Sequence, residues 1–144
     1  MLQSIARTRR FWVPALVLLV SLLVYGVNYG SPKSMFWDEN YHVTSGQKYL
    51  DGTLFMELHP PLGKLLIAAG ETLFGGNEDL DKSRFNRTDY LQGSAVPEGM
   101  SYTGFRFAST FLMALSVLFF YGIVWRITRR VWVAAGFSAL LIFD

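Results

Sequence analysis

The sequence predicts an all-α, polytopic integral membrane protein, and three apolar segments carry this prediction. Phe11–Tyr29 and Phe107–Trp125 each contain 19 residues without a charged side chain. A helix of that length rises about 28 Å, close to the ~30 Å thickness of a hydrocarbon core. A third apolar segment, 131–144, is too short to cross by itself. We expect it to be the truncated start of a third membrane helix, and the chain to be the N-terminal fragment of a longer protein.

The first apolar segment could instead be a cleaved signal peptide, because Arg7, Arg9 and Arg10 precede it as a basic n-region would. The segment is longer than a usual signal-peptide core, however. It also ends in Val27–Gly30, which has no small-x-small cleavage site. These two features favour an uncleaved membrane helix.

Basic residues on the short flanks predict the orientation in the membrane. The N-terminus, 1–10, and the link 126–130 each carry three arginines and no acidic residue, and such flanks usually face the cytoplasm. The loop 30–106 holds seven bases and ten acids, a net charge of −3, and we expect it on the extracytoplasmic or lumenal side. The net charge of +2 is then a topology signal and gives no reason to expect nucleic-acid binding.

The loop is expected to contain short helices. Val43–Leu50 could form one helix, and Pro61 suits the start of another over about 61–74. Apolar residues recur in the second helix at helical spacing, at Leu62, Leu66, Ala69 and Leu73. Lys64 and Glu71 lie on a different face, a pattern that predicts an interfacial amphipathic helix too short to span. Residues 77–100 are rich in Asp, Asn, Ser and Gly and predict an irregular loop.

The adjacent carboxylates Asp38 and Glu39 are the first candidates for chemistry. They follow the first apolar segment closely and have Trp37 and Tyr41 beside them. Adjacent acids on a loop are often only solvated charges. A partly dehydrated, apolar setting would instead raise a carboxylate's pKa toward values suited to proton abstraction.

The string from His59 to Lys64, His-Pro-Pro-Leu-Gly-Lys, is the second candidate. It could be no more than a junction between loop and helix, with Lys64 extended toward water. Alternatively, the free N–H groups of a helix start, together with His59 and Lys64, could bind an anion at the depth of the lipid phosphates.

Arg106 stands at the outer end of the second apolar segment, against the positive-inside trend. A phosphate or carboxylate partner would explain it, and simple anchoring of the helix is the alternative. Asp144, an acid after an apolar run, and Glu57 are possible further site residues. Asn86–Thr88 matches an N-glycosylation sequon. The absence of cysteine excludes disulfides and thiolate metal sites.

These motifs together resemble the protein O-mannosyltransferase family. Trp37-Asp38-Glu39, followed about twenty residues on by the string from Glu57 to Lys64, is similar to that family's first outer loop. Its pattern is aromatic-Asp-Glu and then acidic-x-His-Pro-Pro-Leu-Gly-Lys. Phe105–Phe107 and the Leu140–Asp144 ending also look like the family, so the resemblance runs from about Phe36 to the last residue. One difference is that Tyr41 precedes His42, the reverse of the order in many members, and no role is assigned to either.

The resemblance implies a GT-C fold whose first outer loop, with short interfacial helices, holds the active site. It also implies a donor of mannose on a polyprenyl or dolichyl phosphate and a Ser or Thr acceptor in a protein. We expect Asp38 to be the general base and Glu39 to hold the acceptor, with Arg106, His59 and Lys64 at the donor phosphate. Attack opposite the phosphate implies inversion at the anomeric carbon. No metal or cofactor is expected.

The same resemblance places the protein in a bacterial inner membrane or the endoplasmic reticulum, with the active-site loop on the extracytoplasmic or lumenal side. The expected partners are the lipid-linked donor, a protein or peptide acceptor, membrane lipids and a second subunit in a homo- or heterodimer. Two other functions stay open. One is another GT-C transferase, for example of an amino sugar to a lipid, in which less of the His-Pro-Pro-Leu-Gly-Lys string is expected. The other is a non-catalytic truncated subunit, against which the intact Asp38-Glu39 argues. The fragment alone is expected to be inactive.

Overall fold

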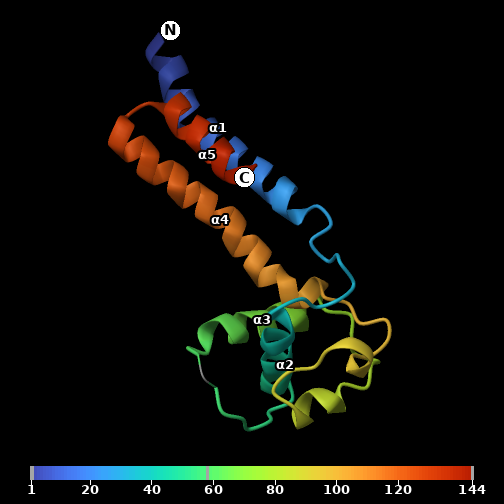
Figure 1. Ribbon diagram of the computed structural model, residues 1–144. Helices are drawn as coiled ribbons and strands as arrows, with labels where there is room; N and C mark the ends of the chain where they lie inside the picture. The colour runs from blue at the N-terminus through green and yellow to red at the C-terminus, as the bar shows by residue number, and fades with distance from the viewer. Residues whose placement is uncertain (1, 58, 144) are drawn as a thin grey trace. The chain divides into compact units, whose positions relative to one another are not determined.

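The computed structural model describes residues 2–57 and 59–143, with side chains from residue 11 onward. The regular secondary structure in this part of the chain is all helical, with no strand, which confirms the predicted all-α class (Figure 1). Its elements are α1 (Leu2–Gly26), α2 (Glu39–Leu50), α3 (Leu62–Phe74), the 3-10 turns η1 (Ser83–Arg87) and η2 (Gly93–Ala95), α4 (Thr103–Thr128) and α5 (Val131–Ile142). The chain divides into two compact units, one of Asn28–Ser109 and one of the segments on either side of it.

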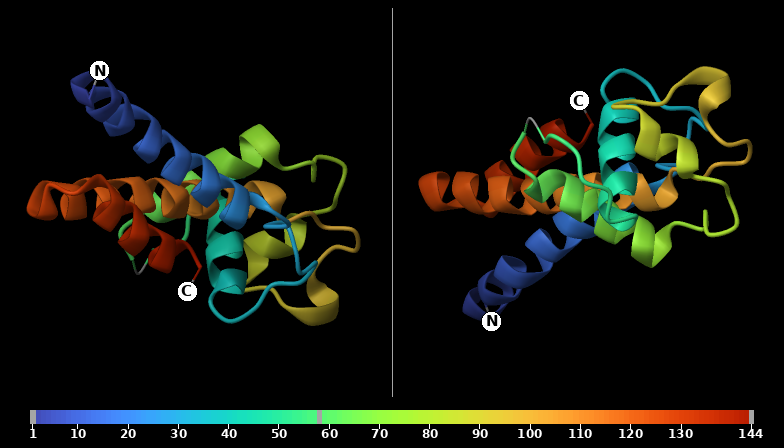
Figure 2. Two further views of the ribbon diagram at one scale, coloured as in Figure 1. Left: turned by 90° about the horizontal axis from the view of Figure 1, so that it is seen from above. Right: turned by 90° about the horizontal axis from the view of Figure 1, so that it is seen from below.

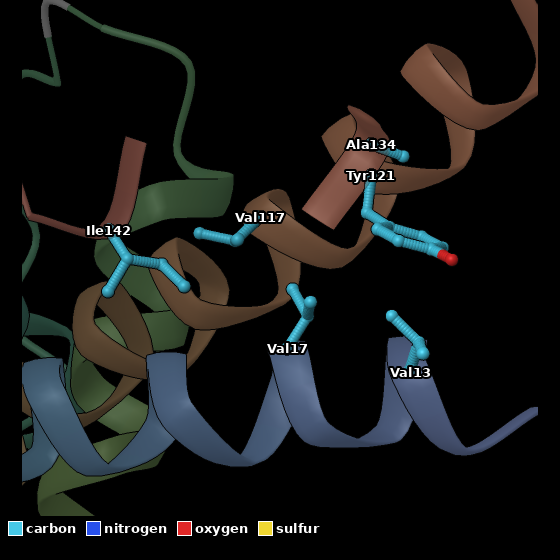
Figure 3. Close-up of a cluster of buried hydrophobic side chains, with 6 residues drawn as sticks. All are labelled: Val13, Val17, Val117, Tyr121, Ala134 and Ile142. Atoms are coloured by element: carbon cyan, nitrogen blue, oxygen red, sulfur yellow. The ribbon is translucent and has the colours of Figure 1, made fainter. Parts of the chain in front are cut away.

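The unit formed by the two ends of the chain contains α1, α5 and the greater part of α4. Helices α1 and α5 lie side by side (Figure 1). Side chains from the three helices meet in one apolar cluster, which Figure 3 shows, made of Val13, Val17, Val117, Tyr121, Ala134 and Ile142. Two hydroxyl groups of the unit are paired with carbonyls: Tyr25 donates to the Leu141 carbonyl at 3.0 Å, and Ser21 donates to the Ala114 carbonyl at 3.2 Å. Such pairing is what an environment without water requires. The buried Ser138 hydroxyl has no partner among the described residues.

Helix α4 is long and apolar enough to cross a membrane, and among the described residues it is the one helix that is. It contains the predicted second span, 107–125, and extends it at both ends. The apolar helical segments Phe11–Gly26 and Val131–Ile142 are shorter. The first helix ends at Gly26, before the predicted Tyr29, and Asn28 already has a positive φ of 61°. That left-handed conformation does not continue an α-helix.

The second unit contains α2 and α3, which lie against each other (Figure 2). Helix α2 begins at Glu39, so the predicted start at Val43 is four residues too late. Its first turn is closed by the Asp38 carbonyl, which accepts from the backbone N–H groups of Tyr41 and His42, each at 3.0 Å. Glu39 in that turn also suits the positive end of the helix dipole.

Helix α3 confirms the predicted amphipathic helix, within a residue of its expected start. Its two faces are used in the reverse of the usual way. The apolar stripe is exposed, with Leu62 at 67% and Leu73 at 70%, whereas Lys64 and Glu71 are 2% and 6% exposed. The unit therefore places the charged face of α3 inward and leaves its apolar face for another apolar environment.

The predicted irregular loop, 77–100, is packed into this unit. Its apolar residues Phe85, Leu91 and Met100 form a buried cluster with Val43, Tyr102 and Phe105. The Asn77 side chain is buried too, donating to Glu71 and to the Ser101 carbonyl, each at 2.7 Å. The polar composition of the loop did not predict this packing, because only a few, irregularly spaced apolar side chains provide it.

Two glycines let α3 and the start of α4 approach closely. A Cβ built on Gly70 would lie 2.5 Å from the Gly104 carbonyl oxygen. A Cβ on Gly104 would lie 2.6 Å from the Glu71 Cα and 2.7 Å from the Gly75 Cα. These neighbours are backbone atoms, so a side chain at either position would have to push the helices apart.

We therefore expect Gly104→Ala to destabilise the chain, by about 1–3 kcal/mol, as overpacked sites do. Gly122→Ala is the matched control on the same helix, because no atom lies within 4 Å of its added Cβ. Thermal unfolding of the purified chain in detergent, followed by circular dichroism, measures both. A midpoint for Gly104→Ala as high as that for Gly122→Ala would contradict the close approach.

Candidate functional site

Asp38 and Glu39 are neighbours in sequence but face different surroundings. Asp38 lines a cavity of about 520 Å³, together with Trp37, Asn40, Tyr41, His42, His59 and Tyr90. The Glu39 side chain is mostly buried and pairs with Arg106. The start of α2 therefore directs one carboxylate into a cavity and uses the other as an internal contact.

The guanidinium of Arg106 holds three segments together. Its Nε and Nη2 donate to the two carboxylate oxygens of Glu39, at 2.5 and 2.8 Å. Nη1 and Nη2 also donate to the carbonyls of Pro32 and Ser34, at 2.9 and 3.0 Å. The carboxylate partner that the sequence led us to suspect is thus Glu39. Two-point pairing of this kind fixes direction as well as distance.

His59, Lys64 and Glu57 form a second charged group beside the cavity. The Lys64 ammonium is paired with the Glu57 carboxylate and lies 3.5 Å from Nδ1 of His59. The backbone N–H of His59 donates to the same Glu57 oxygen at 3.0 Å. Burial by itself would raise the pKa of Glu57, but the bonds from Lys64 and His59 and the Lys64 charge hold that pKa below its ordinary value. Glu57 is therefore ionised at neutral pH.

The rings of Tyr41, His42 and His59 contact one another in the lining of the cavity. The ring of Tyr41 lies edge-to-face with those of His42 and His59, both at 6.1 Å between centroids, and Lys64 sits 4.7 Å from the Tyr41 centroid. Burial, followed by the Lys64 charge, lowers the pKa of His42, against a smaller opposing effect of Asp38. His42 is therefore an uncharged imidazole at pH 7, able to donate or accept a hydrogen bond.

Tyr90 reaches the cavity because α2 holds its loop in place. Lys48 pairs with Asp89 at 3.5 Å, and the Leu91 N–H donates to the Thr44 hydroxyl at 3.1 Å. A third contact comes from Asn86, whose amide donates to the Asp51 carboxylate at 2.8 Å. The asparagine of the sequon thus serves as a tether in the folded chain.

Tyr41 and His42 had no predicted role, and Asn40 and Tyr90 were not among the predicted site residues. Trp37 was expected only as an aromatic neighbour of the carboxylates. Asp38, Tyr41 and His42 have i, i+3, i+4 spacing, so a helix starting at Glu39 would have placed them together. Tyr90 carries no such signal, because its place depends on tertiary tethers. Asp144 lies outside the described residues. No three His, Asp or Glu side chains are grouped as a metal site would need in the part of the chain that is described.

The structure thus brings Asp38 and His59 to one cavity, with Glu57 and Lys64 behind His59, while Glu39 and Arg106 form a separate pair. A carboxylate facing an imidazole across a cavity can take a proton from a hydroxyl on one side. On the other side the imidazole can offer an N–H to an anionic oxygen.

Comparison with known proteins agrees with the sequence resemblance. Residues 15–144 match the family model described as dolichyl-phosphate-mannose-protein mannosyltransferase. The chain is 34% identical over 103 residues to dolichyl-phosphate-mannose–protein mannosyltransferase 1 of Saccharomyces cerevisiae, covering 72% of this chain and 12% of that protein. It is 31% identical over 134 residues to protein O-mannosyl-transferase 2 of Drosophila melanogaster, covering 90% and 16%.

The corresponding enzyme 1 of Candida albicans is 34% identical over 74 residues, which are 51% of this chain and 8% of that protein. The chain thus spans between 8% and 16% of the length of these relatives. No solved structure matches it significantly. Because the family model covers all but the first 14 residues, the chain belongs to the dolichyl-phosphate-mannose–protein mannosyltransferase family.

Proposed function

We propose that this chain supplies the catalytic outer loop of a GT-C membrane glycosyltransferase. The enzyme would transfer mannose from a dolichyl- or polyprenyl-phosphate carrier to Ser or Thr hydroxyls of proteins. The family's name gives the donor and the kind of acceptor. The observation that carries the proposal is the cavity in which Asp38 and His59 face the same space.

In this mechanism Asp38 accepts the proton of the acceptor hydroxyl. The hydroxyl oxygen forms a bond to the anomeric carbon of mannose while the bond from that carbon to the phosphate oxygen breaks. The electron pair leaves with the lipid phosphate, and one displacement inverts the anomeric centre. A positioned general base contributes about 10²–10⁴ in rate, so its loss should dominate the phenotype.

The departing phosphate carries negative charge, and Arg106, His59 and Lys64 are the candidate groups to stabilise it. His59 is the one of the three that lines the cavity, with 61% of its side chain exposed. Arg106 has five N–H groups, and four are engaged by Glu39, Pro32 and Ser34 among the described residues. Its first role in this proposal is to hold Glu39 and the start of α2, which leaves one N–H for substrate. Glu39 is outside the cavity lining, so its place in this proposal is the pair with Arg106.

The loop 30–106 would work on the extracytoplasmic or lumenal side of the membrane. The exposed leucine stripe of α3 suits the boundary between headgroups and acyl chains, which both faces of the membrane offer, so the choice of side rests on the charge of the flanks. The arginine-rich flanks 1–10 and 126–130 support the cytoplasmic position of the opposite ends.

Labelling with a membrane-impermeant maleimide tests this topology, since the chain has no cysteine of its own. Asp79→Cys and Arg129→Cys introduce one thiol each, at exposed positions. We expect Arg129→Cys to react from the cytoplasmic side, and Asp79→Cys to react only from the other side. Reaction of Asp79→Cys from the cytoplasmic side would mean that the loop 30–106 is cytoplasmic, and would contradict the placement.

Asp38→Asn in the full-length enzyme tests the base. We expect the turnover number to fall by about 10²–10⁴, with no loss of folded protein. The helix start survives this change, because Asp38 closes it through its backbone carbonyl and makes no side-chain cap. Asp79→Asn, at an exposed acid outside the cavity, is the control and should keep the wild-type rate. Wild-type turnover in Asp38→Asn would exclude Asp38 as the base.

A further inference from the structure

Lys64 is buried in a way that leaves it no direct access to a substrate. Its side chain is 3% exposed, and its ammonium meets the Glu57 carboxylate, the Nδ1 of His59 and the face of Tyr41. An ammonium has three N–H groups, so each direction already has a partner among the described residues. The Glu57 carboxylate also balances its charge. An incoming phosphate would have to break this pairing before it met Lys64.

The contact with His59 determines where the imidazole carries its proton. An ammonium can only donate, so the Nδ1 atom that lies 3.5 Å from it must be the acceptor. The nearest Glu57 oxygen is 3.9 Å from Nδ1, too far to hold a proton there instead. In the neutral ring the proton is then on Nε2.

The backbone around His59 is set by the same pair. The His59 N–H donates to Glu57 at 3.0 Å, and Glu57 in turn accepts from Lys64. His59 is thus held through its backbone N–H and through Nδ1, while the exposed part of its ring lies in the cavity lined by Asp38 and His42.

We propose that Glu57 and Lys64 are positioning residues that hold His59 with its proton on Nε2, so that it presents an N–H donor to the cavity. The purpose of this arrangement rests on the proposed function, since the Nε2–H group would donate to an oxygen of the leaving phosphate. Lys64 then acts on the mannose donor through His59, without contacting that substrate. The arrangement matches the general way in which the partner of one imidazole nitrogen decides the state of the other.

The tautomer can be measured without any activity. The full chain in detergent is labelled with 15N-histidine, and long-range 1H–15N correlation spectra distinguish the two ring nitrogens. His59→Gln removes one of the two histidine signals and so assigns them. We expect wild-type His59 to be protonated at Nε2. In Lys64→Met the Glu57 carboxylate is no longer held by Lys64, so a small shift toward Nδ1 should bring it within hydrogen-bond distance and draw the proton there. Lys33→Met, at an exposed lysine, should leave the wild-type pattern.

A wild-type ring protonated at Nδ1, or the same pattern in wild type and Lys64→Met, would overturn the inference. Because the wild-type spectrum is informative alone, a variant that does not fold leaves the test intact. This readout is also independent of mannosyl transfer, so it can fail while the proposed function stands, and the reverse.

Kinetics of the full-length enzyme give the second test. Glutamine can offer an amide N–H near the position of Nε2 without any tautomer, so His59→Gln removes the need for Lys64. We expect Lys64→Met to lower kcat/KM for the donor by about tenfold in the wild-type background, and by less than about twofold in the His59→Gln background. The same fold loss in both backgrounds would mean that Lys64 binds the donor directly, and would overturn the positioning role.

Discussion

The ion pair between Glu39 and Arg106 is the interaction on which the unit Asn28–Ser109 depends. It joins the first turn of α2 to the first turn of α4, and through Pro32 and Ser34 to the segment that precedes Trp37. A mostly buried pair of this kind is costly to break from one side, because the remaining charge loses its partner where little water reaches it. Its consequence is geometric. With Glu39 turned toward Arg106, the preceding carboxylate, Asp38, is the one left in the cavity.

The charged face of α3 is likewise buried with its charged groups paired. Lys64 and Glu71 are buried, and each has a partner: Glu57 for Lys64, and Asn77 for Glu71. Burial, more than any other influence, raises the pKa of Glu71, against the bond from Asn77. A helix can place such residues inward only if its leucines have another apolar surface to meet. The membrane boundary is that surface in our proposal. The same helix would then carry the charges behind the cavity and fix the position of the cavity relative to the membrane surface.

Sequence reasoning predicted the all-helical class, the apolar α4 and the bounds of α3, and it selected as candidates Asp38 and His59, which line one cavity, because apolar runs, proline placement and a six-residue motif are local signals. It missed the start of α2, since that turn is closed by the Asp38 carbonyl and not by a side-chain cap that residue types reveal. It also missed Tyr90, which reaches the cavity through tethers from α2. Arg106 was expected to meet an anion, but no periodicity could show that this anion is Glu39.

If Glu39 and Arg106 act as one unit that places Asp38, their effects on turnover are coupled, and a double-mutant cycle on the full-length enzyme measures this coupling. Arg106→Lys removes the two-point geometry, and Glu39→Gln removes the charge. We expect each change to lower kcat by about tenfold or more, and the double variant to be no slower than the slower single one. Arg84→Lys, at an exposed arginine, is the control and should match wild type. If the two losses multiply instead, the residues act on separate substrate groups, and the pair does not organise the site.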